Sequence, residues 1–151
     1  MLEVFNIKDK LEYLDEVANL EYLEWASKPN ENSKQRIENK INKIINNLDR
    51  NNFCKLILLK DDKLIGFISL FDTDGDEKKE FTPWYATMYV KKEYRGNGYS
   101  KILNKAILNE ARKRGFNKVY LKSDLNNYYE KFGAVYLEKL KNGEKLYYID
   151  I

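Results

Sequence analysis

The chain has 151 residues, with 27 lysines and arginines, 24 aspartates and glutamates, and no histidine. That length fits one domain over residues 1–151 and leaves no room for a second catalytic module. The missing histidine excludes Ser-His and Cys-His nucleophilic pairs and histidine-based zinc sites, and we expect no metal. The net charge of +3 is too slight to predict binding to nucleic acid or to a membrane.

The lone cysteine, Cys54, cannot form an internal disulfide, so nothing in the sequence requires an oxidising compartment. We expect it to be a small buried residue of an apolar strand. No apolar run approaches the ~20 residues that span a bilayer. A soluble cytoplasmic protein is therefore the expectation.

The N-terminal third predicts one strand and two amphipathic helices. Residues 2–7 alternate loosely, as in an edge strand. Between Lys10 and Ala26, and again between Ser33 and Leu48, apolar side chains recur every three or four residues. The first helix is expected to stop near residues 27–30, which contain a proline.

The middle of the chain predicts the main strands. Residues 53–59 and 64–71 are short apolar runs joined by a polar turn, which indicates an antiparallel hairpin. A charged loop occupies 72–80, most simply as a solvated turn; the alternative is that its acids, among them Asp72 and Asp74, form an acidic mouth that attracts a cation. Residues 85–90 are rich in aromatic and β-branched side chains, as strands are, and residues 91–98 form a turn with two glycines.

The C-terminal third begins with an amphipathic helix over 99–114 and a strand over 118–121. Strand, helix and strand in succession predict a crossover with parallel strands. A short helix over 124–132 and a hairpin of strands 134–140 and 145–151 complete the pattern. The fold class is α/β, with a mixed, mostly antiparallel, twisted sheet and helices on both faces.

The strongest local feature is the junction between the strand 85–90 and the helix that starts near Tyr99. Backbone N–H groups and the positive helix end meet there, while Gly96 and Gly98 allow an anion to approach closely. The expected ligand is a phosphate group, and Arg95 and Lys101 add positive charge. The segment lacks the Gly-Lys-Ser/Thr of a Walker loop and the third glycine of a dinucleotide fingerprint.

A second feature, Tyr129-Glu130-Lys131-Phe132-Gly133, lies after the next strand. Together with Arg95-Gly96-Asn97-Gly98-Tyr99-Ser100, it resembles the motifs of the GNAT N-acetyltransferase superfamily. The resemblance covers residues 53–151 well, and the order of elements matches as well. It implies the GNAT acyl-CoA N-acyltransferase fold and transfer of an acetyl group from acetyl-CoA to an amine.

The resemblance also implies roles for individual residues. The pantetheine arm of acetyl-CoA would pair with the backbone of Met88, Tyr89 and Val90. Tyr129 would protonate the departing thiolate, because a tyrosine keeps its proton at neutral pH, whereas Tyr128 is expected to pack inward. The residues implied to hold the pyrophosphate are Arg95, Gly96, Asn97, Gly98, Tyr99, Ser100 and Lys101.

The amine acceptor must lose a proton, so a base is required. Glu24, Asp72, Asp124 and a chain of waters are the candidates, and Asp72 is preferred because it ends the strand expected beside the cofactor strand. Trp25 and Trp84 are candidates for lining an acceptor pocket. The acceptor itself, a small-molecule or peptide amine, stays open.

Two alternatives belong to other functional classes. A CoA-binding sensor or partner module would keep the loop without the chemistry. A nucleotide- or RNA-binding domain would use the basic residues within 91–95. For the enzyme, we expect direct transfer in a ternary complex without an acyl-enzyme, and either a monomer or a dimer formed through the C-terminal strands fits the sequence.

Overall fold

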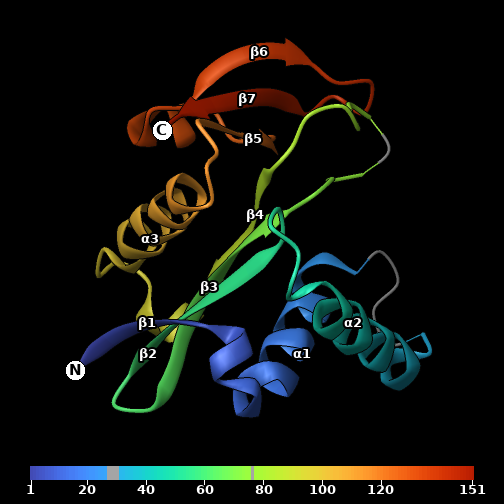
Figure 1. Cartoon of the computed structure of the whole chain (residues 1–151), viewed down its shortest axis with the longest axis vertical. Coiled ribbons are helices and arrows are strands. Elements are labelled where there is room, and N and C mark those ends of the chain that lie inside the picture. Colours follow the sequence, from blue (N-terminus) through green and yellow to red (C-terminus); the bar gives the residue numbers. More distant parts are fainter. Residues whose placement is uncertain (27–30, 76) are drawn as a thin grey trace.

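The computed structural model describes residues 1–26, 31–75 and 77–151. A seven-stranded sheet of order β1-β2-β3-β4-β5-β7-β6 forms its centre (Figure 1). All neighbouring strands are antiparallel except β4 and β5. The strands are β1 (Leu2–Asn6), β2 (Cys54–Lys60), β3 (Lys63–Phe71), β4 (Trp84–Val90), β5 (Lys118–Ser123), β6 (Val135–Lys139) and β7 (Lys145–Asp150). The α-helices are α1 (Leu14–Trp25), α2 (Ser33–Asn47) and α3 (Tyr99–Lys113).

Helices cover both faces of the sheet, with α3 on one side and α1 and α2 on the other (Figure 1). Successive side chains of a strand point to opposite faces, so each central strand contributes to two cores. Leu58 of β2 packs in one core with Leu103 of α3. Its neighbour Ile57 packs in the other core with Val17 of α1. This double covering explains why β2 is a continuous apolar run with almost no alternation.

The sheet opens between β4 and β5. These two parallel strands have one pair in register, Trp84 with Tyr120, near the start of β4. Past that pair, β4 has no partner in register on its β5 side, and a gap opens toward the carboxyl ends of both strands. That edge is the usual entry for ligands in sheets with parallel strands.

A bulge lies on the other side of β4. The register between β3 and β4 shifts between Phe67 and Ser69, so Thr87 has no partner in register on β3. Thr87 has a φ of 48°, in the left-handed region that β-branched residues rarely adopt. The middle of β4 is therefore irregular on both of its edges.

The expected fold class, the β2–β3 hairpin and the parallel crossover are confirmed. The helix expected from Lys10 begins as a 3₁₀ turn at Leu11–Tyr13 and becomes α-helical at Leu14. The helix ends at Trp25, and Ala26 is already extended, so it stops just before the expected position at residues 27–30, which lie outside the described part of the chain.

The short helix predicted over 124–132 is wrong for its first half. Only Tyr129–Phe132 is helical, as a single 3₁₀ turn, η4. The Ser123 hydroxyl accepts a hydrogen bond from the backbone of Leu125 (3.0 Å), and Asn127 has a φ of 57°. Short polar side chains of this kind bond to nearby backbone and compete with helix formation.

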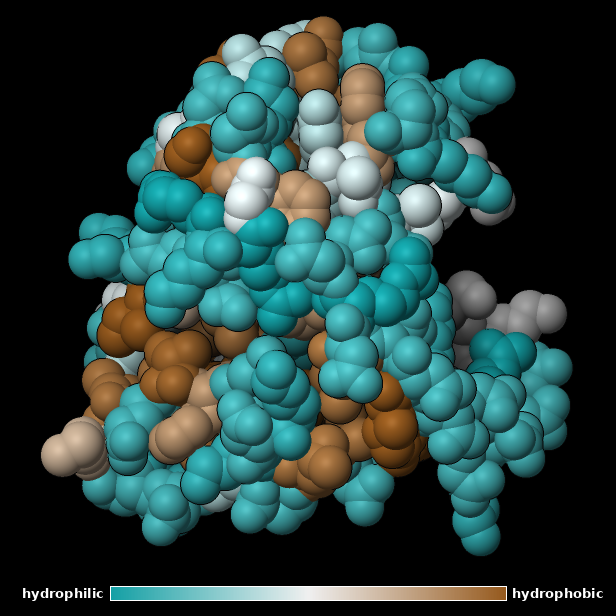
Figure 2. All heavy atoms as spheres, viewed as in Figure 1, coloured by the Kyte–Doolittle hydropathy of each residue, from teal (hydrophilic) through white to brown (hydrophobic). Residues whose placement is uncertain are grey.

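The face of the molecule in Figure 2 is largely hydrophilic, with the larger apolar patches in its lower half and smaller ones near its upper edge. Across residues 1–26, 31–75 and 77–151, no helix is both long enough and apolar enough to cross a membrane.

Candidate functional site

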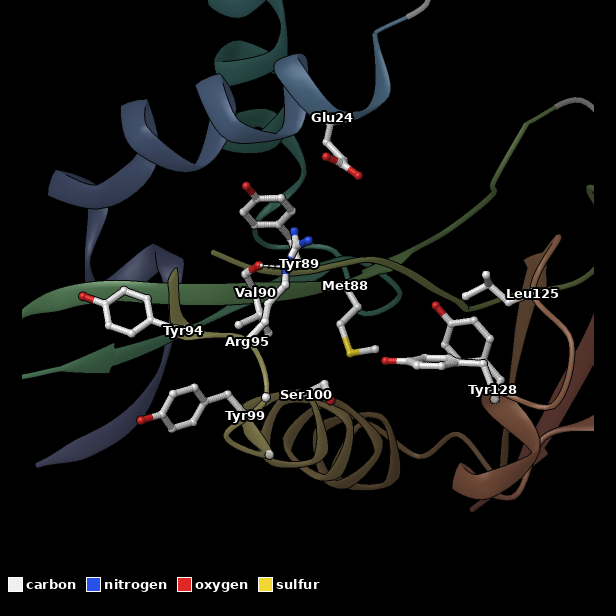
Figure 3. Close-up of a pocket in the computed structure, with 13 residues that line it drawn as sticks. Glu24, Met88, Tyr89, Val90, Tyr94, Arg95, Tyr99, Ser100, Leu125 and Tyr128 are labelled. Atoms are coloured by element: carbon white, nitrogen blue, oxygen red, sulfur yellow. Dashed lines mark hydrogen bonds between the residues drawn. The ribbon is translucent and has the colours of Figure 1, made fainter. Parts of the chain in front are cut away.

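A cleft of about 400 Å³ lies where β4 ends and α3 begins (Figure 3). We call it the loop cleft. Residues from β4, from the glycine turn, from α1 and from the segment around η4 surround it. They are Met88, Tyr89, Val90, Tyr94, Arg95, Gly96, Gly98, Tyr99, Ser100, Glu24, Leu125, Tyr128 and Tyr129.

The glycine turn forms the floor of the loop cleft. Gly96 and Gly98 have φ angles of 85° and 78°, which other residues adopt only with strain. A Cβ atom built on either glycine would meet no heavy atom within 4 Å. The space beside the turn is therefore open to a ligand. At the start of α3 the N–H of Lys101 donates to the carbonyl of Gly98 (3.2 Å), whereas the N–H groups of the first residues of a helix generally have no partner within it. An anion fits this concavity.

Arg95 is held at the rim of the loop cleft. Its Nε donates to the carbonyl oxygen of Val90 (2.8 Å), and its guanidinium lies 5.5 Å from the ring centroid of Tyr89. Figure 3 shows the dashed bond to Val90 and the side chain pointing across the cleft. The remaining N–H groups of the guanidinium can bind phosphate oxygens.

A second cavity, of about 680 Å³, adjoins the first and shares Glu24, Met88, Leu125 and Tyr129 with it. We call it the acidic cavity. Its other lining residues are Trp25, Asp74, Tyr85, Ala86, Thr87, Leu121, Lys122, Ser123, Asp124 and Glu144.

Four carboxylates line the acidic cavity, contributed by Glu24, Asp74, Asp124 and Glu144, against one cationic side chain. That cation, Lys122, is already bound, because its Nζ donates to the backbone carbonyl of Asp74 at 2.8 Å and lies 3.7 Å from the Asp74 carboxylate. Burial raises the pKa of Asp74, although Lys122 opposes the shift. The cavity thus presents a net negative surface in a chain whose overall charge is positive.

Tyr129 stands where the two cavities meet. Its ring makes an edge contact with Tyr128, with centroids 4.8 Å apart. Burial, and to a smaller degree Tyr128, raises the pKa of Tyr129 to about 12. The phenol is therefore fully protonated at neutral pH, and its proton is available to a group that arrives between the two cavities.

Most residues predicted to hold the cofactor come together in the loop cleft. Two of them do not line it. The Asn97 side chain closes the turn by donating to the carbonyl of Tyr94 (2.9 Å), and Lys101 is exposed on α3. The ones that line the cleft are Met88, Tyr89, Val90, Arg95, Gly96, Gly98, Tyr99 and Ser100.

Of the residues predicted to act as the base or to line the acceptor pocket, some line a cavity and others do not. Asp72 forms a salt bridge with Arg50 (3.0 Å) and lines neither cavity. Trp84 is 1% exposed and donates its ring N–H to the carbonyl of Phe81 (2.8 Å), so it belongs to the core. Trp25 lines the acidic cavity, as do the alternative bases Glu24 and Asp124.

Sequence reasoning missed two contributors, Tyr128 and Glu144, and included a third, Asp74, only in the alternative reading of the charged loop. Tyr128 lines the loop cleft, contrary to the expected inward packing. Asp74 belongs to a loop whose dense charge was visible in the sequence, but which of its acids faces the cavity depends on Lys122. Glu144 carries no local signal, because it reaches the cavity only through the pairing of β7 with β5.

Among the described residues, no group of three or more His, Cys, Asp or Glu side chains is placed to hold a metal ion. The open strand edge of β4 and the open space at Gly96 and Gly98 instead fit an extended ligand that ends in phosphates.

Comparison with known proteins agrees with this geometry. The model of the acetyltransferase (GNAT) family matches residues 14–134. No curated protein sequence matches the chain significantly. One similar structure is the PaiA N-acetyltransferase from Thermoplasma acidophilum in complex with coenzyme A, at 22% identity and a TM-score of 0.68, covering 100% of this chain and 99% of that one.

Two further structures have the same fold. The aminoglycoside 6'-acetyltransferase type Ii is 18% identical, with a TM-score of 0.72 and coverage of 99% of this chain and 96% of that chain. YncA from Salmonella typhimurium, solved with its cofactor acetyl-CoA, is 15% identical, with a TM-score of 0.71 and coverage of 99% of this chain and 93% of that chain. The family match over most of the chain, on a fold with the loop cleft at its centre, shows that the chain belongs to the GNAT acetyltransferase family.

Proposed function

We propose that this protein is an acetyl-CoA-dependent N-acetyltransferase that transfers the acetyl group directly to a primary amine. The observation that carries the proposal is the meeting of two cavities at Tyr129, one built around an anion-binding loop and the other lined with carboxylates. The first fits a phosphate-bearing cosubstrate, and the second fits a cationic amine.

Residues of β4 and of the glycine turn would hold the cosubstrate. The backbone of Met88 to Val90 offers the unpaired strand edge to the amide groups of a pantetheine arm. Backbone amides from Gly96 to Ser100 would bind the pyrophosphate at the start of α3, since the Arg95 N–H already donates to the carbonyl of Lys92 (3.3 Å). Acetyl-CoA, when bound, supplies an activated thioester, so no covalent activation by an imidazole is needed.

In the transfer, the amine nitrogen attacks the thioester carbonyl, a C–N bond forms and the C–S bond breaks. Tyr129 donates its phenolic proton to the departing sulfur. The nitrogen loses two protons in all. The first leaves the ammonium group before the attack and passes to a carboxylate of the acidic cavity, directly or through water. The second leaves the nitrogen after the C–N bond forms and restores the proton of Tyr129, directly or through water. Glu24 is our preferred base in place of Asp72, because Glu24 lines both cavities whereas Asp72 is paired with Arg50 outside them.

The proposed acceptor is a small cationic amine. Glu24, Asp124 and Glu144 supply negative charge, and the ring of Trp25 supplies an apolar face beside it. Carboxylates that line a cleft raise the local concentration of a cation and orient its ammonium group. A peptide amine is the alternative acceptor, and a panel of amines distinguishes the two.

The deciding experiment measures thiol release from acetyl-CoA across a panel of amines that includes polyamines, aminoglycosides, lysine and peptide N-termini. We expect amine-dependent thiol release with at least one small polycationic amine, and an acetylated product of matching mass. Binding of acetyl-CoA without release for any amine would favour the CoA-binding module. Salt-sensitive RNA binding without acetyl-CoA binding would favour the nucleic-acid alternative.

A separate test addresses the direct route. The protein is incubated with acetyl-CoA alone, and its intact mass is measured before and after addition of an amine. We expect an unchanged protein mass. A protein mass increased by one acetyl group, and restored by the amine, would show an acyl-enzyme and overturn direct transfer.

A further inference from the structure

A buried polar network lies beneath the acidic cavity and has no role in the proposed acetyl-transfer chemistry. Lys55 of β2 is 0% exposed and forms an ion pair with Glu21 of α1, which is 2% exposed. The ammonium of Lys55 also donates to the hydroxyl of Ser69 on β3 (2.6 Å). A buried ion pair is costly to desolvate and is a poor source of stability compared with apolar residues of the same size.

The network ends at the cavity wall. The hydroxyl of Ser69 is hydrogen-bonded to that of Thr87 on β4 (2.6 Å), and Thr87 lines the acidic cavity. Burial acts to raise the pKa of Glu21, but the nearby charges of Lys55 and Lys40 hold it below its ordinary value. The chain of contacts therefore runs from a charged pair in the core, through Ser69, to a residue of the site.

Thr87 is also the residue with the least favourable backbone conformation in β4. Its φ of 48° is rare for a β-branched side chain, and it sits in the bulge where β3 and β4 lose register. Such a conformation persists only where the surroundings fix it. The contacts that fix the side chain of Thr87 are those to Ser69 and, behind it, to the Lys55–Glu21 pair.

The bulge matters because Met88 is the next residue of β4. Met88 lines both cavities and begins the strand edge proposed to bind the pantetheine arm. A change of backbone conformation at Thr87 would turn the peptide between Thr87 and Met88 and displace the point at which thioester and amine must meet. Displacements of about 1 Å at such a point cost about a hundredfold in rate.

Resting on the proposed function, we infer that Glu21, Lys55 and Ser69 are positioning residues for acetyl transfer, which fix the backbone of the β4 bulge through the hydroxyl of Thr87. They touch neither reactant. Their effect passes through one side chain, which makes the inference testable with conservative substitutions.

The test compares Thr87→Val, which keeps the branched shape and removes the hydroxyl, with Thr87→Ser, which keeps the hydroxyl. Ser69→Ala removes the link from the other side. We expect Thr87→Val and Ser69→Ala to lower kcat about tenfold or more while the KM for acetyl-CoA changes less than about twofold, and Thr87→Ser to retain most of kcat. Equal kcat in all three folded variants would overturn the inference.

The ion pair is tested by the double substitution Glu21→Leu with Lys55→Met, because removing Glu21 alone would leave the buried Lys55 without its carboxylate. Glu21 also pairs with the partly exposed Lys40 (3.6 Å), whose ammonium can turn to solvent in the double variant. We expect a folded protein with a kcat lowered like that of Ser69→Ala. Wild-type kcat in this folded double variant would remove Glu21 and Lys55 from the positioning role.

Amide hydrogen exchange separates this positioning role from the proposed function. Exchange at Thr87 and Met88 in the free protein should accelerate in Ser69→Ala relative to the wild type, whatever reaction the protein catalyses. If no amine is acetylated by the wild type but exchange accelerates, the proposed function fails and the structural link stands. Unchanged exchange at both residues would overturn the link itself.

Discussion

The ring of Tyr129 stands edge-on to the ring of Tyr85, with centroids 5.9 Å apart and an interplanar angle of 82°. Tyr85 is buried on β4 and Tyr129 belongs to η4, so this contact ties the proposed proton donor to the strand that borders both cavities. Edge contacts between aromatic rings are geometrically specific. The position of the Tyr129 hydroxyl is consequently set by packing and does not depend on a bound ligand.

Removing the Tyr129 hydroxyl should lower the rate of thiol release without weakening the binding of acetyl-CoA. In Tyr129→Phe the ring keeps its packing, so we expect the Kd for acetyl-CoA to stay within about twofold, while kcat for thiol release falls about a hundredfold. Calorimetry and the thiol assay measure the two quantities. Tyr128→Phe, a change at the adjacent tyrosine of the loop cleft, is the matched control and should retain most of kcat. Equal losses in both variants would contradict the role of Tyr129.

The raised pKa of Tyr129 determines what this residue contributes to the pH profile of kcat. A phenol is neutral and able to donate below its pKa, and burial together with Tyr128 extends that range from 10.0 to about 12. We therefore expect no basic limb due to Tyr129 in the pH profile of kcat below about pH 10. A decline near pH 8 that disappears in Tyr129→Phe would show that the phenol loses its proton far earlier than its surroundings require.

Glu24 should matter more than Asp72. Replacing Glu24 by glutamine removes a carboxylate shared by both cavities, and we expect kcat/KM for a cationic amine to fall about tenfold to a hundredfold. Asp72→Asn breaks only a partly exposed pair with Arg50, so activity should change less than about twofold. The same thiol assay measures kcat/KM for both variants. A larger loss in Asp72→Asn than in Glu24→Gln would favour Asp72 as the base.

The glycine turn can be tested with a matched pair at the two ends of α3. Gly96 and Gly115 both have positive φ, 85° and 93°, and a Cβ on either would meet no heavy atom within 4 Å. Alanine at either position should therefore cost a similar amount of stability, about 1–2 kcal/mol. Only Gly96→Ala should raise the Kd for acetyl-CoA, by about fivefold or more, and so reduce the thermal shift that acetyl-CoA produces. An equal change in Kd for Gly115→Ala would mean that the loop is not the binding element.

The elements that could be predicted from the sequence are those with local causes. The helical stripes, the apolar run of β2 and the turn from Arg95 to Gly98 are each determined by residues close together in the chain. The helix predicted from residue 124 failed because hydrogen bonding by Ser123 and the left-handed Asn127 compete with it. Trp84 was predicted to line a pocket because it directly precedes the cofactor strand in the sequence. In the structure it is buried in a small core with Leu140 and Leu146 from the C-terminal hairpin.

The acidic cavity could be predicted only in part, through the candidate bases Glu24 and Asp124 and the alternative acidic mouth of the charged loop, because its carboxylates come from four separate segments. Glu24 ends a helix, Asp74 and Asp124 lie in loops, and Glu144 lies in the final hairpin. The buried Lys55 was equally hidden, since a lysine in an apolar strand has no visible partner until α1 folds across the sheet and brings Glu21 to it.

The single pair in register between β4 and β5 has a mechanical consequence. Strands β1 to β4 and strands β5 to β7 are paired only at Trp84 and Tyr120, yet both parts pack against α3 in one core. The backbone groups of β4 beyond Trp84 therefore stay unpaired on the β5 side although the sheet is held together on both sides of the opening.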